Sequence, residues 1–198
     1  RALHDRVDAW STANADQLHG ADESSAGAAA TVQRIAAAMG SEGFLATATG
    51  GEAAGSYGKL DARSLCICRE VLARHAGLAD FAFAMQGLGT GPINLFGTPE
   101  QKSRWLPAVA SGTSIAAFAL SEAEAGSDVA ALATTARRDG NGWRLDGAKT
   151  WISNAGIADI YVVFARTGEA PGAKGLSAFV VEAGTPGFEV SKVIDLIA

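Results

Sequence analysis

Apolar side chains in the first half of the chain recur every three or four residues, a spacing that predicts helices. A first amphipathic helix is expected to carry Leu3, Val7, Trp10 and Leu18. Small residues at positions 24–27 predict a linker, and a second helix is expected over residues 28–39, with Gly40 as its C-terminal cap. Residues 46–58 are rich in Gly, Ala and Thr and are expected to form a loop.

Two longer helices are predicted after that loop. Asp61 suits the N-cap of the first, which is expected to end at residues 75–77. The second covers residues 78–96 and ends at Gly97. Because this helix is apolar on most of its faces, we expect it to be buried.

The clearest local signal in the first half is Thr98-Pro99-Glu100-Gln101. Thr98 can cap a helix, Pro99 suits the first helical position, and Gln101 closes a capping box. A short helix is therefore expected through Trp105 and Leu106, and the apolar spacing changes near residue 113.

Beyond that point the pattern indicates short strands. The candidates are residues 115–120, 134–138, 143–145, 150–152, 160–165, 176–181 and 188–193. Gly140-Asn141-Gly142 is a hairpin signal between two of them, and Asp146-Gly147 predicts a second turn of the same kind. Because no helix separates the strands, the sheet is expected to be mainly antiparallel.

The fold class predicted from these patterns is α+β and multidomain. Residues 1–113 are expected to form an all-α domain, and residues 114–198 an incomplete, mainly antiparallel β-barrel or sandwich. The last strand candidate has no partner, and an open sheet edge favours aggregation. We therefore expect the natural chain to continue past Ala198.

Composition excludes several classes of protein. Hydrophobic residues make up 48% of the 198 positions and charged residues 19%, which suits a packed core rather than a disordered chain. The formal net charge is −5 and no basic stripe is present, so a nucleic-acid binder is not indicated. Cys66 and Cys68 point apart on a helix, which fits free thiols in a reducing cytoplasm.

Three motif patterns are considered and set aside. The glycines of residues 87–92 resemble a phosphate loop, but they lie within a helical stretch, and close helix packing explains them better. His4, His19 and His75 are scattered, so no metal site is expected. The absence of a Gly-x-Ser-x-Gly motif leaves an acyl hydrolase without support.

Two segments carry candidate chemistry. In residues 118–128 a strand leads into a turn of small residues and hydroxyls, and Gly126 allows the backbone to approach an anion or a ring edge. In residues 149–154, Trp151 is expected on a strand beside the Ser153 hydroxyl, where it could cover a flat aromatic ligand. An ordinary loop and a core aromatic are the alternative explanations when each segment is taken alone.

Together the two segments resemble the flavin-binding signatures of the acyl-CoA dehydrogenase family. The matching stretches are residues 119–122 with 125–128, and then residues 147–154. Residues 96–102, followed by Leu106-Pro107 and Ser111-Gly112, resemble the family's approach to its β-domain. Residues 161–166 and 175–181 resemble its next strands.

This resemblance implies FAD as cofactor, with residues 118–127 holding the flavin. It places backbone and hydroxyl groups near Leu120 and Ser121 at the pyrimidine edge, and Ser127 at the CoA portion of the substrate. It places Trp151 over the isoalloxazine face and Ser153 near N5. The implied cofactor-binding set is Phe118, Leu120, Ser121, Gly126, Ser127, Trp151, Ile152 and Ser153.

The implied reaction is α,β-dehydrogenation of an acyl-CoA thioester. A glutamate removes the α-proton, the β-hydrogen leaves as hydride to the flavin, and electrons pass to an electron-transferring flavoprotein. Family subunits are homodimers or homotetramers and need a carboxy-terminal helical bundle, which this chain lacks and which supplies the catalytic glutamate. Glu122 belongs to the flavin loop and is not expected to be the base.

Alternatives remain open at this point. An acyl-CoA oxidase or a flavin monooxygenase on the same scaffold fits the motifs, as does a non-catalytic flavin-binding protein. The chain also departs from the family pattern, with Ala123 and Glu124 where Pro and Gly are usual. Serines 121 and 153 replace the usual threonines and keep the hydroxyl.

Overall fold

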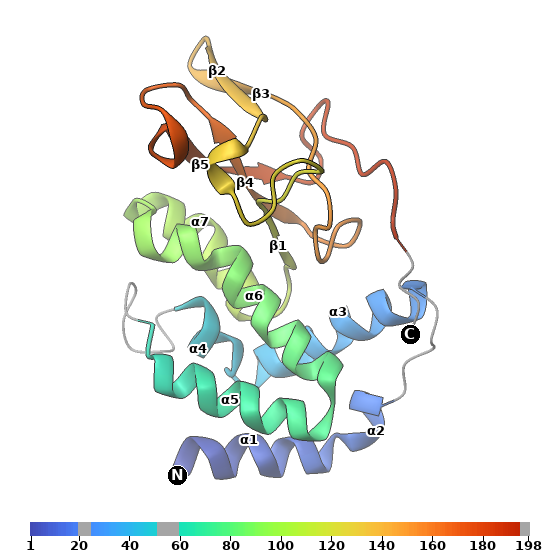
Figure 1. Cartoon of the computed structure of the whole chain (residues 1–198). Coiled ribbons are helices and arrows are strands. Elements are labelled where there is room, and N and C mark those ends of the chain that lie inside the picture. Colours follow the sequence, from blue (N-terminus) through green and yellow to red (C-terminus); the bar gives the residue numbers. More distant parts are fainter. Residues whose placement is uncertain (20–24, 51–59, 195–198) are drawn as a thin grey trace.

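The computed structural model describes residues 1–19, 25–50 and 60–194 of the 198-residue chain. Figure 1 shows a helical part below and a sheet above, with α6 running between them. The helices are α1 Ala2–Ala13, α2 Ala15–His19, α3 Ser25–Ser41, α4 Leu45–Thr49, α5 Ala62–His75, α6 Gly77–Phe96 and α7 Pro99–Ala110. The strands are β1 Ala116–Ala119, β2 Thr135–Asp139, β3 Gly142–Asp146, β4 Ile160–Arg166 and β5 Leu176–Glu182.

Two helix starts form as their local sequence predicts. The Asp61 carboxylate accepts the Arg63 N–H at 3.2 Å and begins α5. At α7, Thr98 Oγ1 accepts the Gln101 N–H at 3.3 Å, while Gln101 Oε1 accepts the Thr98 N–H at 2.8 Å. This reciprocal pair confirms the predicted capping box.

Three helical predictions are wrong in detail. Leu18 lies on the separate helix α2, because α1 ends at Ala13. Helix α3 begins at Ser25, so part of the expected linker is helical, and it continues through Gly40. The cap is Gly43 instead, at φ 75°, where its N–H bonds to Gly40 O and the Phe44 N–H bonds to Met39 O.

Gly40 has a packing role. A side chain there would collide with the carbonyl of Ser111, in the turn that follows α7. The same reasoning applies to two of the three glycines in residues 87–92, which lie inside α6. A Cβ on Gly87 would lie 3.0 Å from Cβ of Ala48, and one on Gly89 would lie 2.6 Å from Cβ of Ala116, whereas a Cβ on Gly91 would meet no atom within 4 Å. Close helix packing, rather than a phosphate loop, is therefore confirmed at Gly87 and Gly89.

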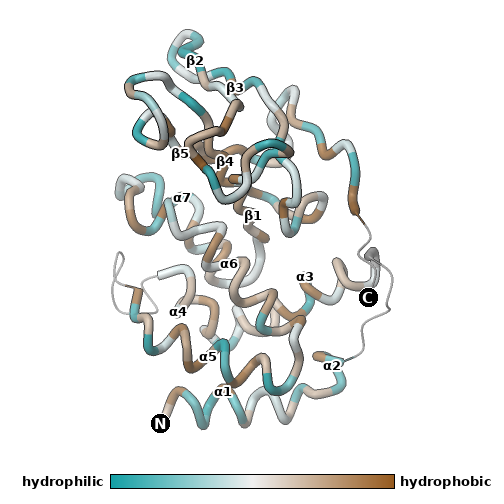
Figure 2. Tube along the Cα trace, in the orientation of Figure 1, coloured by the Kyte–Doolittle hydropathy of each residue, from teal (hydrophilic) through white to brown (hydrophobic). Residues whose placement is uncertain are grey.

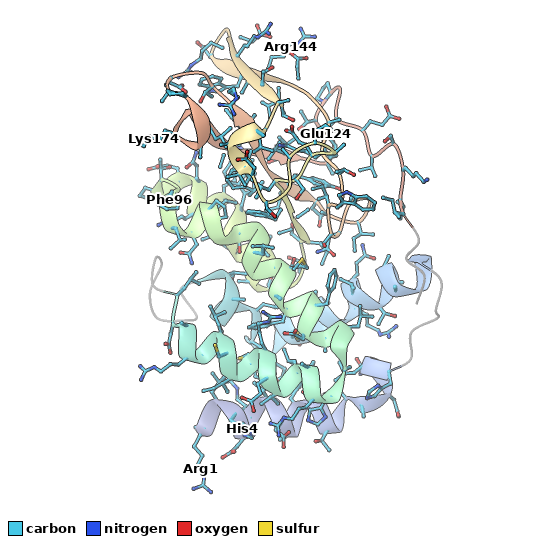
Figure 3. All side chains as sticks on the ribbon, viewed as in Figure 1. Arg1, His4, Phe96, Glu124, Arg144 and Lys174 are labelled. Carbon is cyan, nitrogen blue, oxygen red and sulfur yellow. The ribbon has the colours of Figure 1, made fainter. Side chains whose placement is uncertain are left out.

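Two other expectations need correction. The loop expected over residues 46–58 is helical as far as Thr49, and positions 51–58 lie outside the described residues. Helix α6 is buried on one side only. Leu88, Leu95 and Phe96 are exposed by 45%, 51% and 86%, and Figure 3 shows Phe96 at the outer edge of the molecule, where α6 ends.

The sheet is mixed, with β4 as its central strand. β5 pairs with β4 and β3 with β2, both antiparallel, as expected. β1, however, pairs with β4 in parallel, with Ala116 opposite Ile160, and β2 meets β4 in parallel at Arg166. The long connection over residues 120–159 makes the parallel pair possible without a helix. The fold class, a helical domain followed by a sheet domain, is confirmed.

Two strand candidates do not form strands. Residues 150–152 form no strand, because the chain bends at Trp151, whose φ of 58° lies outside the extended region; a turn over residues 153–157 follows. Residues 188–193 pair with no strand in the described part of the chain, although Phe188 and Val190 pack their side chains on the core. The predicted β2–β3 hairpin is present, with Gly140 at φ 56° in its turn.

The sheet packs on both of its faces. Ala117, Ala119 and Val163 face the main core, which the helices α1, α3, α5 and α6 complete. Ala116 and Val162 face a second cluster with Leu106 and Val109 of α7. Figure 2 shows this apolar interior as brown segments through the central strands and helices, with teal at the hairpin tip. No helix within the described ranges is long and apolar enough to cross a membrane.

Gln86 joins the helical part to the sheet. It is 1% exposed; its Oε1 accepts the Ala116 N–H at 2.8 Å, and its Nε2 donates to Ser114 O at 2.8 Å. We expect Gln86→Met to lower the free energy of unfolding by about 1–3 kcal/mol for each backbone group left unpaired. Urea denaturation measures this, with Gln33→Met on the exposed side of α3 as control. Equal losses in both variants would contradict the assignment.

Candidate functional site

The two segments with candidate chemistry meet at the end of β1. The Thr150 N–H donates to Ser121 O at 3.0 Å. Lys149 Nζ donates to Leu120 O at 2.9 Å. Residues that are far apart in the sequence are therefore joined by direct hydrogen bonds.

A buried ion pair holds this junction. Lys149 Nζ lies 2.8 Å from Glu122 Oε1, and the two side chains are only 10% and 9% exposed. Glu122 Oε2 also accepts the Ala133 N–H at 2.7 Å, and Oε1 accepts the Thr134 N–H at 3.0 Å. A buried pair of this kind is stable only when its remaining donors and acceptors are bonded, and these contacts meet that requirement.

The same contacts fix the charge of Glu122. Burial acts to raise the pKa of its carboxyl, but the hydrogen bonds from Lys149, Thr134 and Ala133 outweigh burial and lower the pKa to about 2. For Lys149, burial lowers the pKa and outweighs the opposing effect of Glu122. Glu122 is thus a fully engaged carboxylate, consistent with the expectation that it is not the catalytic base.

A tight turn follows Glu122. The Glu122 N–H bonds to Ala125 O at 2.9 Å, and the Ala125 N–H bonds to Glu122 O at 3.2 Å. Glu124 lies exposed at its tip, as Figure 3 shows. Gly126 and Ser127 come next and are exposed, and the Asp128 side chain then caps the short helix η2 (Val129–Ala131) by accepting the Ala130 N–H.

The second segment displays Trp151 on a strained turn. Its φ of 58° lies in the left-handed region, and its side chain is 69% exposed. Such a backbone is rare for a bulky residue and costs about 1–3 kcal/mol. The surrounding structure maintains it: Asn154 Nδ2 donates to Ala116 O at 3.0 Å, and the Gly156 N–H donates to the Tyr161 hydroxyl at 3.1 Å.

A broad concavity lies beside this turn. It is bounded by one face of the sheet, by segment 185–194 and by parts of α3 and α6, and its volume is about 2060 Å³. That exceeds the roughly 300–1,000 Å³ of ordinary small-molecule pockets, so it is an open groove with room for an extended ligand. Predicted site residues on its wall are Trp151, Ile152 and Ser153.

The other predicted site residues are placed differently. Leu120 and Ser121 lie directly behind the turn of Trp151, through the bonds described above. The Phe118 ring packs against Phe164, with centroids 5.0 Å apart, on the strand face opposite Ala119. Gly126 and Ser127 are not among the wall residues that the structure describes.

Sequence reasoning assigned no role to several residues of the site. Lys149 and Asn154 stand inside the quoted motif, and a lysine beside small apolar residues was a signal for a buried ion pair. Trp143 and Phe179 also line the concavity, with ring centroids 5.4 Å apart. Their strands were predicted, but their shared location depends on strand pairing that the sequence did not reveal.

The groups available to a ligand include hydroxyls, an indole and charged side chains, since Arg144, Asp146, Glu189 and Lys192 also line the concavity. Within the described residues, the side-chain hydroxyls of Ser121, Ser127 and Ser153 form no hydrogen bond with another protein group. In the same ranges, no group of three or more His, Cys, Asp or Glu side chains is placed to hold a metal ion. The site therefore offers a flat apolar surface at Trp151, the neighbouring Ser153 hydroxyl, and charged side chains elsewhere on the wall.

Comparison with known families agrees with this arrangement. Residues 1–113 match the model of the acyl-CoA dehydrogenase N-terminal domain, and residues 117–196 match that of the acyl-CoA dehydrogenase middle domain. The chain belongs to the acyl-CoA dehydrogenase family. The resemblance drawn from the two motifs is thereby confirmed.

Individual family members show the extent of the similarity. An acyl-CoA dehydrogenase of Bacillus subtilis is 49% identical over 105 residues, which are 53% of this chain and 28% of that protein. A short-chain specific mitochondrial acyl-CoA dehydrogenase of Bos taurus is 42% identical over 158 residues, which are 79% of this chain and 38% of that protein. The chain therefore spans well under half the length of these relatives.

Solved structures of the family share the fold. A glutaryl-CoA dehydrogenase of Mycobacterium smegmatis aligns with a TM-score of 0.76 and 31% identity, over 96% of this chain and 48% of that one. An acyl-CoA dehydrogenase of Bacillus anthracis complexed with FAD aligns with a TM-score of 0.74 and 31% identity, over 96% of this chain and 32% of that one.

Removing one partner of the buried pair is expected to destabilise the protein strongly. Glu122→Ala leaves the Lys149 ammonium buried without its carboxylate, and we expect a loss of about 3–5 kcal/mol in the free energy of unfolding. Asp146→Ala is the matched control: its pair with Arg144 is 3.9 Å long and 57–72% exposed. That change should cost at most about 1 kcal/mol. Comparable losses of unfolding free energy in the two variants would mean that the buried pair stabilises the protein no more than an exposed pair does.

The buried pair also predicts acid sensitivity. Because the folded pKa of Glu122, about 2, lies below its ordinary value of 4.5, its contribution is complete above pH 4.5. The contribution is lost as the pH falls from 4.5 towards 2. Urea denaturation at pH 6 and pH 3.5 should therefore show a smaller acid-induced loss in Glu122→Gln than in the parent. An unchanged pH dependence would assign the acid loss to other carboxyls.

Proposed function

We propose that the protein containing this chain is an FAD-dependent enzyme that carries out α,β-dehydrogenation of an acyl-CoA thioester. The observation that carries the proposal is Trp151, which is held exposed in a strained turn at the wall of an open groove. The turn is bonded directly to the backbone of Leu120 and Ser121. Membership of the family adds independent support.

A flavin suits these residues on physical grounds. An indole exposed by 69% on a backbone that costs energy is unfavourable unless a ligand covers it. A flat aromatic ring stacked on Trp151 would bury that surface and make an aromatic contact as well. Solved structures of family members contain FAD or FADH2 at comparable similarity to this chain.

The residue roles we propose follow the resemblance. Trp151 and Ile152 cover one face of the ring, and the Ser153 hydroxyl bonds near its reactive edge. The backbone of Phe118 and Leu120, with the Ser121 hydroxyl, meets the opposite edge. Because the Phe118 ring packs on Phe164, only its backbone is available for this contact.

The exposed stretch after the turn completes the proposed site. Gly126 lets the backbone approach the ligand, and Ser127 bonds the CoA portion of the substrate. Both residues are exposed, and Asp128 fixes the chain directly after them.

The bound flavin would supply the hydride acceptor. The chain itself supplies orientation: Lys149 bonds the Leu120 carbonyl and holds the peptide that faces the ring. Backbone N–H groups that are fixed in this way do not have to move during the reaction, and they can therefore stabilise charge that develops on a ligand. Glu122 is engaged by Lys149 and two amides, so we propose that another glutamate removes the proton. The resemblance to the family leads us to propose that this glutamate lies outside residues 1–198.

Partners follow the same proposal. We propose an electron-transferring flavoprotein as acceptor and a homodimeric or homotetrameric enzyme; one structural neighbour is described as an electron transferring flavoprotein of Acidaminococcus fermentans. Another neighbour, described as PigA with FAD and proline, keeps a different flavin chemistry open as the second candidate. The oxygen reactivity of the reduced flavin separates the dehydrogenase from an oxidase or monooxygenase.

An anaerobic absorbance titration tests the proposal. The full-length protein, supplied with FAD, is titrated with acyl-CoA esters of different chain length. Bleaching of the flavin by one class of ester is expected and would identify the substrate. A shifted spectrum without bleaching would favour a non-catalytic flavin protein.

Trp151→Ala tests the position of the flavin. Because the side chain is 69% exposed, we expect the stability of the flavin-free protein to change by no more than about 0.5 kcal/mol. The dissociation constant for FAD should rise by about tenfold or more, since one face of the ring loses its aromatic cover. Trp105→Phe, on α7, is the control and should leave FAD affinity unchanged. Unaltered FAD affinity in Trp151→Ala would mean that the ring binds elsewhere.

A further inference from the structure

Arg166, at the end of β4, makes an unusual set of contacts. Its guanidinium donates to three carbonyl oxygens: Ala130 O at 2.8 Å, Leu132 O at 3.1 and 3.2 Å, and Gly172 O at 3.1 Å. Its own N–H donates to Thr134 O at 2.7 Å. Within the described residues it forms no ion pair with a carboxylate. Its charge is therefore directed at backbone carbonyls.

Two of these carbonyls, at Ala130 and Leu132, belong to one short segment, residues 128–134, which links the exposed turn to β2. The third, at Gly172, begins the short helix η3 (Gly172–Gly175). Glu122 holds the far end of that segment by accepting the N–H groups of Ala133 and Thr134. The segment is thus fixed between opposite charges, with amides bonded to Glu122 and carbonyls bonded to Arg166. Charge-assisted hydrogen bonds of this kind are stronger than neutral ones.

The exposed residues Gly126 and Ser127 lie between two fixed points. On one side is the turn closed by Glu122 and Ala125. On the other side is η2, whose carbonyl at Ala130 is bonded to Arg166. Without Arg166, η2 itself would rest on the Asp128 cap and the weak bonds within a single short turn, and the next charged contact would be that of Glu122 with Ala133 and Thr134.

We propose that Arg166 is a positioning residue for Gly126 and Ser127, and through them for the CoA portion of the substrate. The inference rests on the proposed function, which places Ser127 at that part of the ligand. Arg166 acts by fixing η2 and does not touch the ligand itself. A planar guanidinium is required, because a lysine ammonium cannot reach three carbonyls from one fixed fork.

The test uses the full-length enzyme with FAD bound and the acyl-CoA ester that bleaches it. In Arg166→Met we expect KM for the ester to rise about tenfold, with kcat within about threefold and FAD content preserved. Arg166→Lys should give a smaller rise in KM. Ser127→Ala provides the comparison, since it should change KM in the same direction.

Arg104→Met is the matched control. Arg104 pairs with Glu182 at 2.7 Å between α7 and β5, so its loss removes an arginine contact elsewhere on the sheet. We expect KM to stay unchanged in this variant. An unchanged KM in Arg166→Met would overturn the proposal. A rise in KM accompanied by lower kcat and lower FAD content would also overturn it, because that combination is expected if Arg166 only stabilises the fold.

Amide hydrogen exchange gives a second readout that needs no turnover. In Arg166→Lys, exchange at residues 130–132 should be about tenfold faster than in the parent enzyme, while β4 and β5 keep their protection. Unchanged exchange at these amides would overturn the proposal even if Arg166→Met fails to fold. Absence of bleaching in the parent enzyme would refute the proposed function instead, and the exchange result would then decide the role of Arg166.

Discussion

The buried pair of Glu122 and Lys149 is the interaction on which the rest of the site depends. Two charges removed from water are costly, and their attraction compensates only if the remaining lone pairs and protons are also bonded. Here those bonds recruit the amides of Ala133 and Thr134 and the carbonyl of Leu120. The need to satisfy one carboxylate and one ammonium thus draws three distant stretches of chain into a fixed arrangement.

That arrangement places the exposed side chain of Trp151 beside backbone that is held rigidly by hydrogen bonds. The turn of Trp151 is strained and open, yet Asn154 and Tyr161 anchor it to the sheet by hydrogen bonds. An exposed ligand-binding group is held most accurately when its own backbone is locked by neighbouring packing. The energy cost at Trp151 is offset by bonds made a few residues away, which is typical of binding sites in which the backbone is strained.

The helical half contributes a small part of the wall and the support for this site. Gln86 ties α6 to the start of β1, and the small Gly89 lets helix and strand approach closely. β1 in turn carries the peptide of Leu120 and Ser121 to Lys149. A change in the packing of α6 is therefore transmitted to the residues that face the groove, because each link is a direct bond or contact.

The sequence by itself determined the features that are satisfied locally. The helix starts at Asp61 and Thr98 and the hairpin turn at Gly140 each depend on partners within a few residues, so their sequence signatures were sufficient. Only the tertiary structure decided the parallel pairing of β1 with β4, the left-handed turn at Trp151 and the pairing of Glu122 with Lys149. The strand pattern around Trp151 was misleading because local preference was outweighed by bonds to β1 and β4. Those partners lie far away in the sequence, and no local pattern records which distant group will meet a buried charge.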